Sequence, residues 1–330
     1  MRDTLSIVIS AYNEEENISE IYRRLKTVVS SLSLRVVEYI FVDDGSTDQT
    51  FNCCLKLQAI DPEVKIVRLS RNFGHETAMT AGLDHASGEA VIFIDADLQH
   101  PPEYVRDMVR LWQNGHDVVL TRRIDNEAVS PLYKLGANIF YYLLNALSDT
   151  PIPANTPDFR LLGQKYINFL KSFDERDSLF RGALAWGISV NHLATIDFTA
   201  PRRLTGKSKY TLLKSLRLAF NSILQFSVKP LYLSMWLAAL TALFALGLEV
   251  DVIAERYLLH NPTPGYATIV ITTLIMGTIN LTVLTIIGAY IAKIHVETKK
   301  RPLYLADFIT AEKPLEGEAA AEPEHVTHNS

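Results

Sequence analysis

Residues 90–99 read AVIFIDADLQ, an apolar run that ends in two aspartates separated by one alanine. The run does not alternate with polar residues, which is typical of a strand buried on both faces of a parallel sheet. Parallel sheets bind ligands beyond the carboxyl ends of their strands, where the connecting loops meet. Asp95 and Asp97 therefore stand where a ligand would bind.

The neighbouring sequence repeats this pattern of apolar strands separated by helices. Strands are predicted at 5–10, 36–42, 64–69, 90–94 and 117–120, and helices at about 18–32, 46–59 and 76–86 and after Pro102. Asn13 with Glu16, and Ser46 with Gln49, have the spacing of helix-starting capping patterns. The fold class is therefore predicted as α/β with a mainly parallel sheet.

Polar clusters follow four of the predicted strands, and we expect them to share one rim of the sheet. They are Tyr12-Asn13-Glu14, Asp43-Asp44, Arg71-Asn72 and Asp95-Ala96-Asp97. The sequence has no GxGxxG after the first strand and no GxxxxGK[ST]. We therefore do not expect a glycine-rich loop to bind the diphosphate of a nucleotide. Carboxylates suited to Mg²⁺ or Mn²⁺ are the alternative way to hold a diphosphate.

Composition narrows the choice of partners. The net charge of −5 gives no reason to expect nucleic acid. The two cysteines, Cys53 and Cys54, are adjacent, which disfavours a bridge between them, and no CxxC pair suggests zinc.

Two apolar stretches late in the chain, Pro230–Leu248 and Tyr266–Ala292, contain no charged residue. As helices they would be roughly 28 Å and 40 Å long, against a hydrocarbon core of about 30 Å, so two membrane spans are predicted. Lysines and arginines are concentrated before the first stretch and after the second. The connector is therefore predicted to lie outside, and both termini in the cytoplasm.

These patterns divide the chain into six parts. We expect a cytoplasmic catalytic domain at 1–200, a basic loop with an amphipathic interface helix at 201–228, spans at 229–250 and 266–292, an external connector at 251–265, and a cytoplasmic basic segment with a disordered tail at 293–330. Gly277 and Gly288 offer small surfaces through which copies of the chain could pack as a homo-oligomer.

Four motifs in this order, YNEEEN at 12–17, VDDGSTD at 42–48, SRNFGHE at 70–76 and DADLQHPPE at 95–103, resemble family-2 glycosyltransferases of the dolichol-phosphate-mannose synthase type. Their bacterial polyisoprenyl-phosphate branch is similar at NTPDFR (155–160), GKSKY (206–210) and RPLY (301–304). The likeness covers about residues 4–309. It departs at Ser10, where many relatives have proline, and at Pro157, where glycine is expected.

The resemblance implies a GT-A, Rossmann-like nucleotide-diphospho-sugar transferase fold in an inverting, metal-dependent enzyme of the inner membrane. Its acceptor would be undecaprenyl phosphate and its donor UDP-glucose, giving a lipid-linked monosaccharide for cell-envelope glycans. GDP-mannose, a UDP-N-acetylhexosamine and a UDP-aminoarabinose derivative stay open as donors, because a few pocket contacts decide sugar selectivity.

The resemblance also assigns residues to the site. Donor contacts are expected from Ala11, Tyr12, Glu14, Asp43, Asp44, Arg71, Asp95, Ala96 and Gln99, and Mg²⁺ or Mn²⁺ ligation from Asp95, Asp97 and Gln99. Catalytic roles are expected for Asp97, Asp158, Arg160 and Lys209. Candidates for the acceptor phosphate are Arg122, Lys134, Arg160, Arg203, Ser208 and Lys209.

A phosphate monoester has a second pKa of about 6 and is largely a dianion at neutral pH, so it needs no strong base. Asp158 is accordingly expected to orient substrate rather than remove a proton. His75 is open between a site residue and a structural loop residue, whereas His100 is expected only to precede a turn.

Two rival functions are a processive polysaccharide synthase and a non-catalytic scaffold for lipid-linked sugars. The first usually has a Q-x-x-R-W motif and more spans, whereas Gln225 is followed by Phe-Ser-Val. The second needs no pair of metal-binding acids.

Overall fold

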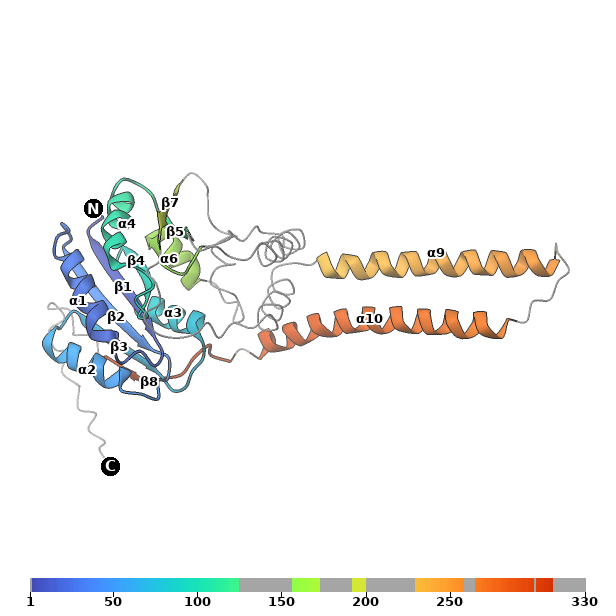
Figure 1. Ribbon diagram of the computed structural model, residues 1–330, viewed down its shortest axis with the longest axis horizontal. Helices are drawn as coiled ribbons and strands as arrows, with labels where there is room; N and C mark the ends of the chain where they lie inside the picture. Colours follow the sequence, from blue (N-terminus) through green and yellow to red (C-terminus); the bar gives the residue numbers. More distant parts are fainter. Residues whose placement is uncertain are drawn as a thin grey trace, which may run out of the picture.

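The computed structural model describes residues 2–124, 156–172, 192–199, 229–257, 265–299 and 301–310. It contains a layered α/β domain and two long helices that run side by side away from that domain (Figure 1). The predicted interface helix at 201–228 and the tail from 311 onward lie outside the described residues.

One sheet forms the centre of the domain, with the strand order β7-β5-β6-β4-β1-β2-β3-β8. The strands are β1 (Thr4–Ala11), β2 (Val36–Asp43), β3 (Val64–Leu69), β4 (Ala90–Asp95), β5 (Val118–Arg123), β6 (Arg160–Gly163), β7 (Leu193–Phe198) and β8 (Ala306–Ile309). Strands β1 to β4 are parallel to one another, and β5 is parallel to β7. β6 runs antiparallel to β4 and β5, and β8 runs antiparallel to β3. The predicted mainly parallel sheet is confirmed.

Helices cover both faces of the sheet (Figure 1). They are α1 (Ile18–Val29), α2 (Thr50–Ile60), α3 (His75–Asp84), η1 (Pro102–Tyr104), α4 (Val105–Gln113) and α6 (Gln164–Lys171). Alternate side chains of β1 pack on opposite faces of the sheet. Ile7 and Ile9 belong to the core beneath α1 and α4, and Val8 belongs to the core beneath α3 and α6.

Helix α3 packs directly against β1 at Gly82. A Cβ on Gly82 would come within 2.2 Å of Cγ1 of Val8, so the absence of a side chain at this position sets the distance between helix and strand. Ala78 and Met79, which are buried on the same helix, extend this contact. The close packing fixes where the first residue of α3, His75, stands relative to the end of β1.

The two predicted capping patterns were wrong, because two loops bond to each other instead. Asn13 has a positive φ of 55°, and its side-chain oxygen accepts a hydrogen bond from the backbone N–H of Thr47 at 2.9 Å. Ser46 Oγ accepts one from the backbone N–H of Asn13 at 3.0 Å. Helices α1 and α2 begin after Asn17 and Gln49 without a side-chain cap.

The long helices extend beyond their predicted ends. α9 covers Lys229–Tyr257, so the first part of the predicted external connector is helical, and α10 covers Tyr266–Thr298. By length and apolar composition, Ile271–Val296 in α10 is the one candidate membrane span in the described part of the chain, and the apolar stretch Ser234–Leu248 in α9 is shorter. The span predicted at 229–250 therefore stays a prediction.

The chain returns to the sheet after α10. Strand β8 lies within residues 293–330, where a cytoplasmic basic segment and a disordered tail were expected, and it pairs with β3 at the edge of the sheet. Four residues are too few to give a periodic signal, and their partner strand is distant in the sequence.

Candidate active site

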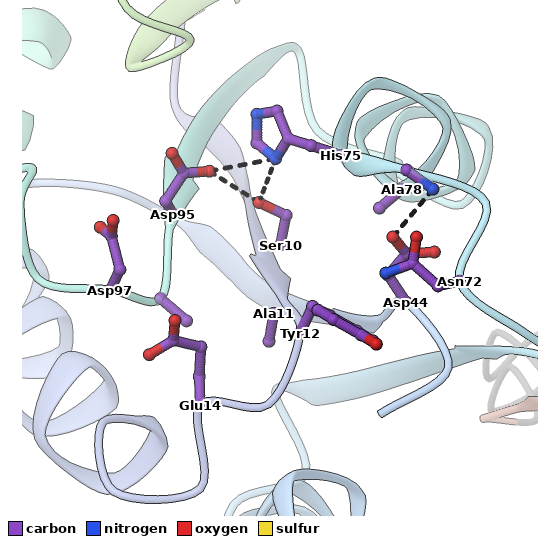
Figure 2. A pocket seen from close by; sticks show the side chains of 12 residues that line it. Ser10, Ala11, Tyr12, Glu14, Asp44, Asn72, His75, Ala78, Asp95 and Asp97 are labelled. Carbon is purple, nitrogen blue, oxygen red and sulfur yellow. Dashed lines mark hydrogen bonds and ion pairs between the residues drawn. The ribbon is translucent and has the colours of Figure 1, made fainter. Parts of the chain in front are cut away.

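A pocket of about 250 Å³ opens where β1, β2 and β4 end and α3 begins (Figure 2). Its walls are formed by Ser10, Ala11, Tyr12, Glu14, Asp44, Asn72, Gly74, His75, Ala78, Asp95, Ala96 and Asp97. The predicted rim is therefore real: members of all four polar clusters line the pocket.

Three acids gather on one wall of this pocket. Asp95 ends β4, and Asp97 and Glu14 lie on the same side of the pocket in Figure 2. Burial raises the pKa of Glu14; a hydrogen bond from Asn17 opposes this shift, and the charges of Asp97 and Asp95 add to it. This concentration of negative charge would attract a cation.

Gln99, which was expected to be a metal ligand, contacts the carboxylate of Asp97. Its backbone N–H donates to Oδ1 of Asp97 at 3.0 Å, and its side-chain amide donates to Oδ2 at 2.7 Å. Gln99 therefore orients the Asp97 carboxylate. Within the described residues there is no cluster of three His, Cys, Asp or Glu side chains that could hold a metal. Two carboxylates still suit Mg²⁺, which commonly binds one or two of them together with substrate phosphates and water.

The paired aspartates at the end of β2 differ from each other. Asp44 lines the pocket, and its carboxylate accepts hydrogen bonds from the backbone N–H groups of Phe73 at 2.7 Å and Gly74 at 3.0 Å. Burial raises the pKa of Asp44, although these two bonds oppose the shift. Asp43 is buried, and its Oδ1 accepts the N–H of Ser46 at 2.9 Å. Asp44 holds the loop before α3, and Asp43 holds the turn after β2.

The basic residue of this rim, Arg71, stacks its guanidinium over the ring of Phe73 at 4.7 Å. The neighbour of Arg71, Asn72, lines the pocket. Asn72 belongs to the same predicted polar cluster, but no role was predicted for it.

His75 is the main site residue that sequence reasoning left undecided. Its Nδ1 lies 3.1 Å from Oγ of Ser10 and 3.4 Å from Oδ1 of Asp95. Its Nε2 lies 3.3 Å from Oδ2 of Asp158. Ser10 also donates to Oδ1 of Asp95 at 2.8 Å (Figure 2), so the departure at this position has a structural role. The signal for His75 was its place directly after Gly74, at the start of a helix on the ligand-binding rim.

His100 does more than precede a turn. It is buried, its ring stacks on that of Phe159 at 5.3 Å, and its Nδ1 lies 3.6 Å from Oδ2 of Asp95. The two histidines therefore approach the two oxygens of Asp95 from different elements.

Asp158 and Arg160 form a buried ion pair, and each residue is only 4% exposed. Arg160 begins β6, which pairs with β4 and so brings Asp158 toward Asp95. The predicted acceptor residue Arg122 instead forms two hydrogen bonds with the exposed Asp197, at 2.7 and 2.8 Å. The other acceptor candidates, Lys134, Arg203, Ser208 and Lys209, lie outside the described residues.

Comparison with known proteins decides the family. The sequence model of glycosyl transferase family 2 matches residues 6–170. The chain belongs to glycosyl transferase family 2. The expected GT-A fold and glycosyltransferase activity are thereby confirmed.

This family-2 glycosyltransferase has relatives along most of its length. The bactoprenol glucosyl transferase of Shigella phage SfV is 34% identical over 305 residues, covering 91% of this chain and 97% of the relative. A prophage bactoprenol glucosyl transferase homolog of Escherichia coli K12 is 33% identical with the same coverage. An uncharacterized glycosyltransferase of Bacillus subtilis 168 is 37% identical over 91% of this chain and 92% of its own.

Among solved structures, glucosyl-3-phosphoglycerate synthase from Mycobacterium tuberculosis, in complex with Mn²⁺, UDP and glucosyl-3-phosphoglycerate, matches with a TM-score of 0.47 and 19% identity. The match covers 68% of this chain and 80% of that one.

Proposed function

We propose that this glycosyltransferase transfers glucose from UDP-glucose to undecaprenyl phosphate, with inversion, at the cytoplasmic face of the inner membrane. The observation that carries the proposal is the full-length match to proteins named bactoprenol glucosyl transferases, which extends over 91% of the chain and so includes the apolar helices as well as the catalytic domain. The acidic pocket gives this reaction a site for its donor.

On this proposal, Asp95 and Asp97 hold Mg²⁺ or Mn²⁺ together with the donor diphosphate. The metal ion would neutralise the charge that develops on the departing UDP. Gln99 keeps the Asp97 carboxylate turned toward the pocket through its two hydrogen bonds. The half-buried Glu14 adds negative charge on the same wall, which favours the binding of a cation.

The acceptor phosphate attacks the anomeric carbon of the sugar. A bond forms between that carbon and a phosphate oxygen, and the bond to the UDP oxygen breaks with its electron pair leaving on UDP. Because the acceptor is already a dianion, no proton has to be removed from it. Asp158 suits an orienting role, since one carboxylate oxygen accepts from Arg160 and the other faces His75 at 3.3 Å.

The chain path supports two membrane crossings. Strand β7 precedes α9 and strand β8 follows α10, yet both belong to the same sheet. The chain between them must therefore cross a membrane an even number of times. If α10 crosses, as the candidate span Ile271–Val296 suggests, α9 is the natural return path because it lies alongside α10 (Figure 1). The catalytic domain would then lie at one face of the membrane, where it can reach a lipid phosphate.

The test uses the full-length protein in nanodiscs with undecaprenyl phosphate and a panel of labelled sugar-nucleotides. We expect labelled glucose to enter the lipid fraction from UDP-glucose, as one sugar per lipid, and EDTA to stop the transfer. Preferred use of GDP-mannose, a UDP-N-acetylhexosamine or a UDP-aminoarabinose derivative would overturn the donor assignment. A growing polymer would indicate a processive synthase, and no transfer from any donor would indicate a scaffold.

A further inference from the structure

Ser10 and His75 lie in the pocket but have no role in the reaction as proposed above. We propose that these two side chains form a hydrogen-bonded bridge that fixes the carboxylate of Asp95 relative to that of Asp158. They are positioning residues, because they act through the two acids. This inference rests on the proposed function, in which Asp95 helps to hold the donor and Asp158 orients substrate.

The number of hydrogens on each side chain shows which atom donates each hydrogen bond of the bridge. The hydroxyl of Ser10 has a single hydrogen, which it donates to Oδ1 of Asp95 at 2.8 Å. Oγ of Ser10 can then only accept from Nδ1 of His75 at 3.1 Å, so Nδ1 carries a hydrogen. The remaining ring nitrogen, Nε2, lies 3.3 Å from Oδ2 of Asp158. The four side chains form one continuous chain of polar contacts.

The backbone around His75 is fixed at two points. Asp44 accepts the N–H groups of Phe73 and Gly74, the two residues that precede it. On the other side, α3 is pressed against β1 at Gly82 and Val8. Because its backbone is held in place, the His75 side chain can keep the carboxylates of Asp95 and Asp158 at a fixed separation.

The far end of the bridge is equally constrained. Asp158 is buried and ion-paired with Arg160, which belongs to the strand next to β4. Asp95 ends β4 itself. The two acids are therefore connected through the sheet by their backbones and across the pocket by Ser10 and His75. Losing the second connection would leave the pocket intact but misplace the reacting groups, and misplacement by about 1 Å can cost roughly 100-fold in rate.

Kinetics of the full-length enzyme test this role, with UDP-glucose and undecaprenyl phosphate as substrates. We expect His75→Ala and Ser10→Ala to lower kcat by about 10-fold or more while the KM for UDP-glucose changes less than about threefold. His75→Gln and His75→Asn each keep one amide donor and should restore part of kcat. His85→Gln, at the other end of α3, is the matched control and should behave as wild type. A kcat of His75→Ala within about threefold of wild type, or equal losses in all three His75 variants, overturns the bridge.

A second readout does not depend on catalysis. The ring nitrogens of the 9 histidines can be observed by ¹⁵N NMR in the metal-free protein, and His75→Gln identifies the His75 signals. We expect Ser10→Ala and Asp158→Asn each to shift the His75 ring resonances, and His85→Gln to leave them in place. If neither variant moves them, the bridge does not exist. If both move them but the wild type transfers no sugar, the bridge stands and the proposed function fails.

Discussion

Oγ1 of Thr310 accepts a hydrogen bond from the backbone N–H of Ile66 at 2.8 Å, across 244 positions of sequence. The backbone N–H of Thr310 donates in turn to the carbonyl of Ile66 at 2.9 Å, and the amide of Gln58 reaches the same hydroxyl at 2.8 Å. Nearer the pocket, the N–H of Ser70 donates to the carbonyl of Leu305 at 2.8 Å. The segment that follows α10 therefore braces the strand that leads into the pocket loop.

Replacing Thr310 with valine tests this brace. Valine keeps the side chain's shape but cannot accept the two hydrogen bonds, so we expect a loss of about 1–3 kcal/mol in the free energy of unfolding. Thr298→Val is the matched control, because the hydroxyl of Thr298 donates to the carbonyl of His295 within its own helix, at 3.1 Å. Thermal unfolding in detergent measures both variants, and equal melting temperatures would contradict the brace.

Gly45→Ala should damage the pocket through a neighbouring loop. Gly45 has φ of +67°, and a Cβ would lie 2.3 Å from the backbone carbon of Arg71, just before the pocket residue Asn72. Gly115 also has a positive φ, +109°, but its Cβ would meet nothing within 4 Å. Each alanine should lower the free energy of unfolding by about 1 kcal/mol, because alanine disfavours a positive φ. Only Gly45→Ala should also displace the loop that contains Arg71 and Asn72. UDP binding by calorimetry should weaken in Gly45→Ala and not in Gly115→Ala; equal affinities would refute this.

Glu38 makes stability depend on pH. Burial raises its pKa, but Lys65 at 2.7 Å, the hydroxyl of Ser6 and the N–H of Ser87 outweigh burial and lower it. A lowered folded pKa stabilises the fold above the ordinary glutamate value of about 4.3, and this stabilisation is lost as the pH falls through the folded value.

Glu38→Gln should therefore destabilise the protein at pH 7, by about 1–3 kcal/mol, and the difference from wild type should shrink in acid. The exposed Glu63, paired with Lys26 at 2.6 Å, gives the control Glu63→Gln, for which we expect less than about 1 kcal/mol. Chemical unfolding at several pH values measures both, and a difference that grows in acid would have the wrong sign.

Asp158→Asn separates orientation from base catalysis. Since the acceptor phosphate is a dianion above its second pKa of about 6, the variant should lose kcat by a similar factor at every pH from there upward. The pH profile of sugar transfer provides the measurement. Recovery of activity above about pH 8 would show that Asp158 removes a proton, and would refute the orienting role.

The sequence could predict the central strands because their signal is local. β1 to β4 are uninterrupted apolar runs, and each was placed to within two residues. β6 and β8 escaped prediction because each has four residues and gains its stability from partners far away in the chain. The capping patterns misled for the related reason that Asn13 and Ser46 bond to each other's loops rather than to their own helices.

The sequence could predict which polar residues lie along the rim of the sheet. It could not predict how their side chains contact one another. Asp95, Asp97 and Glu14 follow strands whose carboxyl ends meet, so topology alone brings them together. The position of His75 depends on how closely α3 packs on β1, which Gly82 decides through a contact that no local pattern reveals.

In the proposed function, acids at the end of β4 hold the donor while a lipid phosphate receives its sugar. The most direct test is the initial rate of glucose transfer from UDP-glucose to undecaprenyl phosphate by Asp97→Asn, measured with Mn²⁺ beside the wild type. We expect a fall of about 100-fold or more, because the variant loses a carboxylate that would help to hold the metal ion. A rate within about threefold of wild type would contradict it.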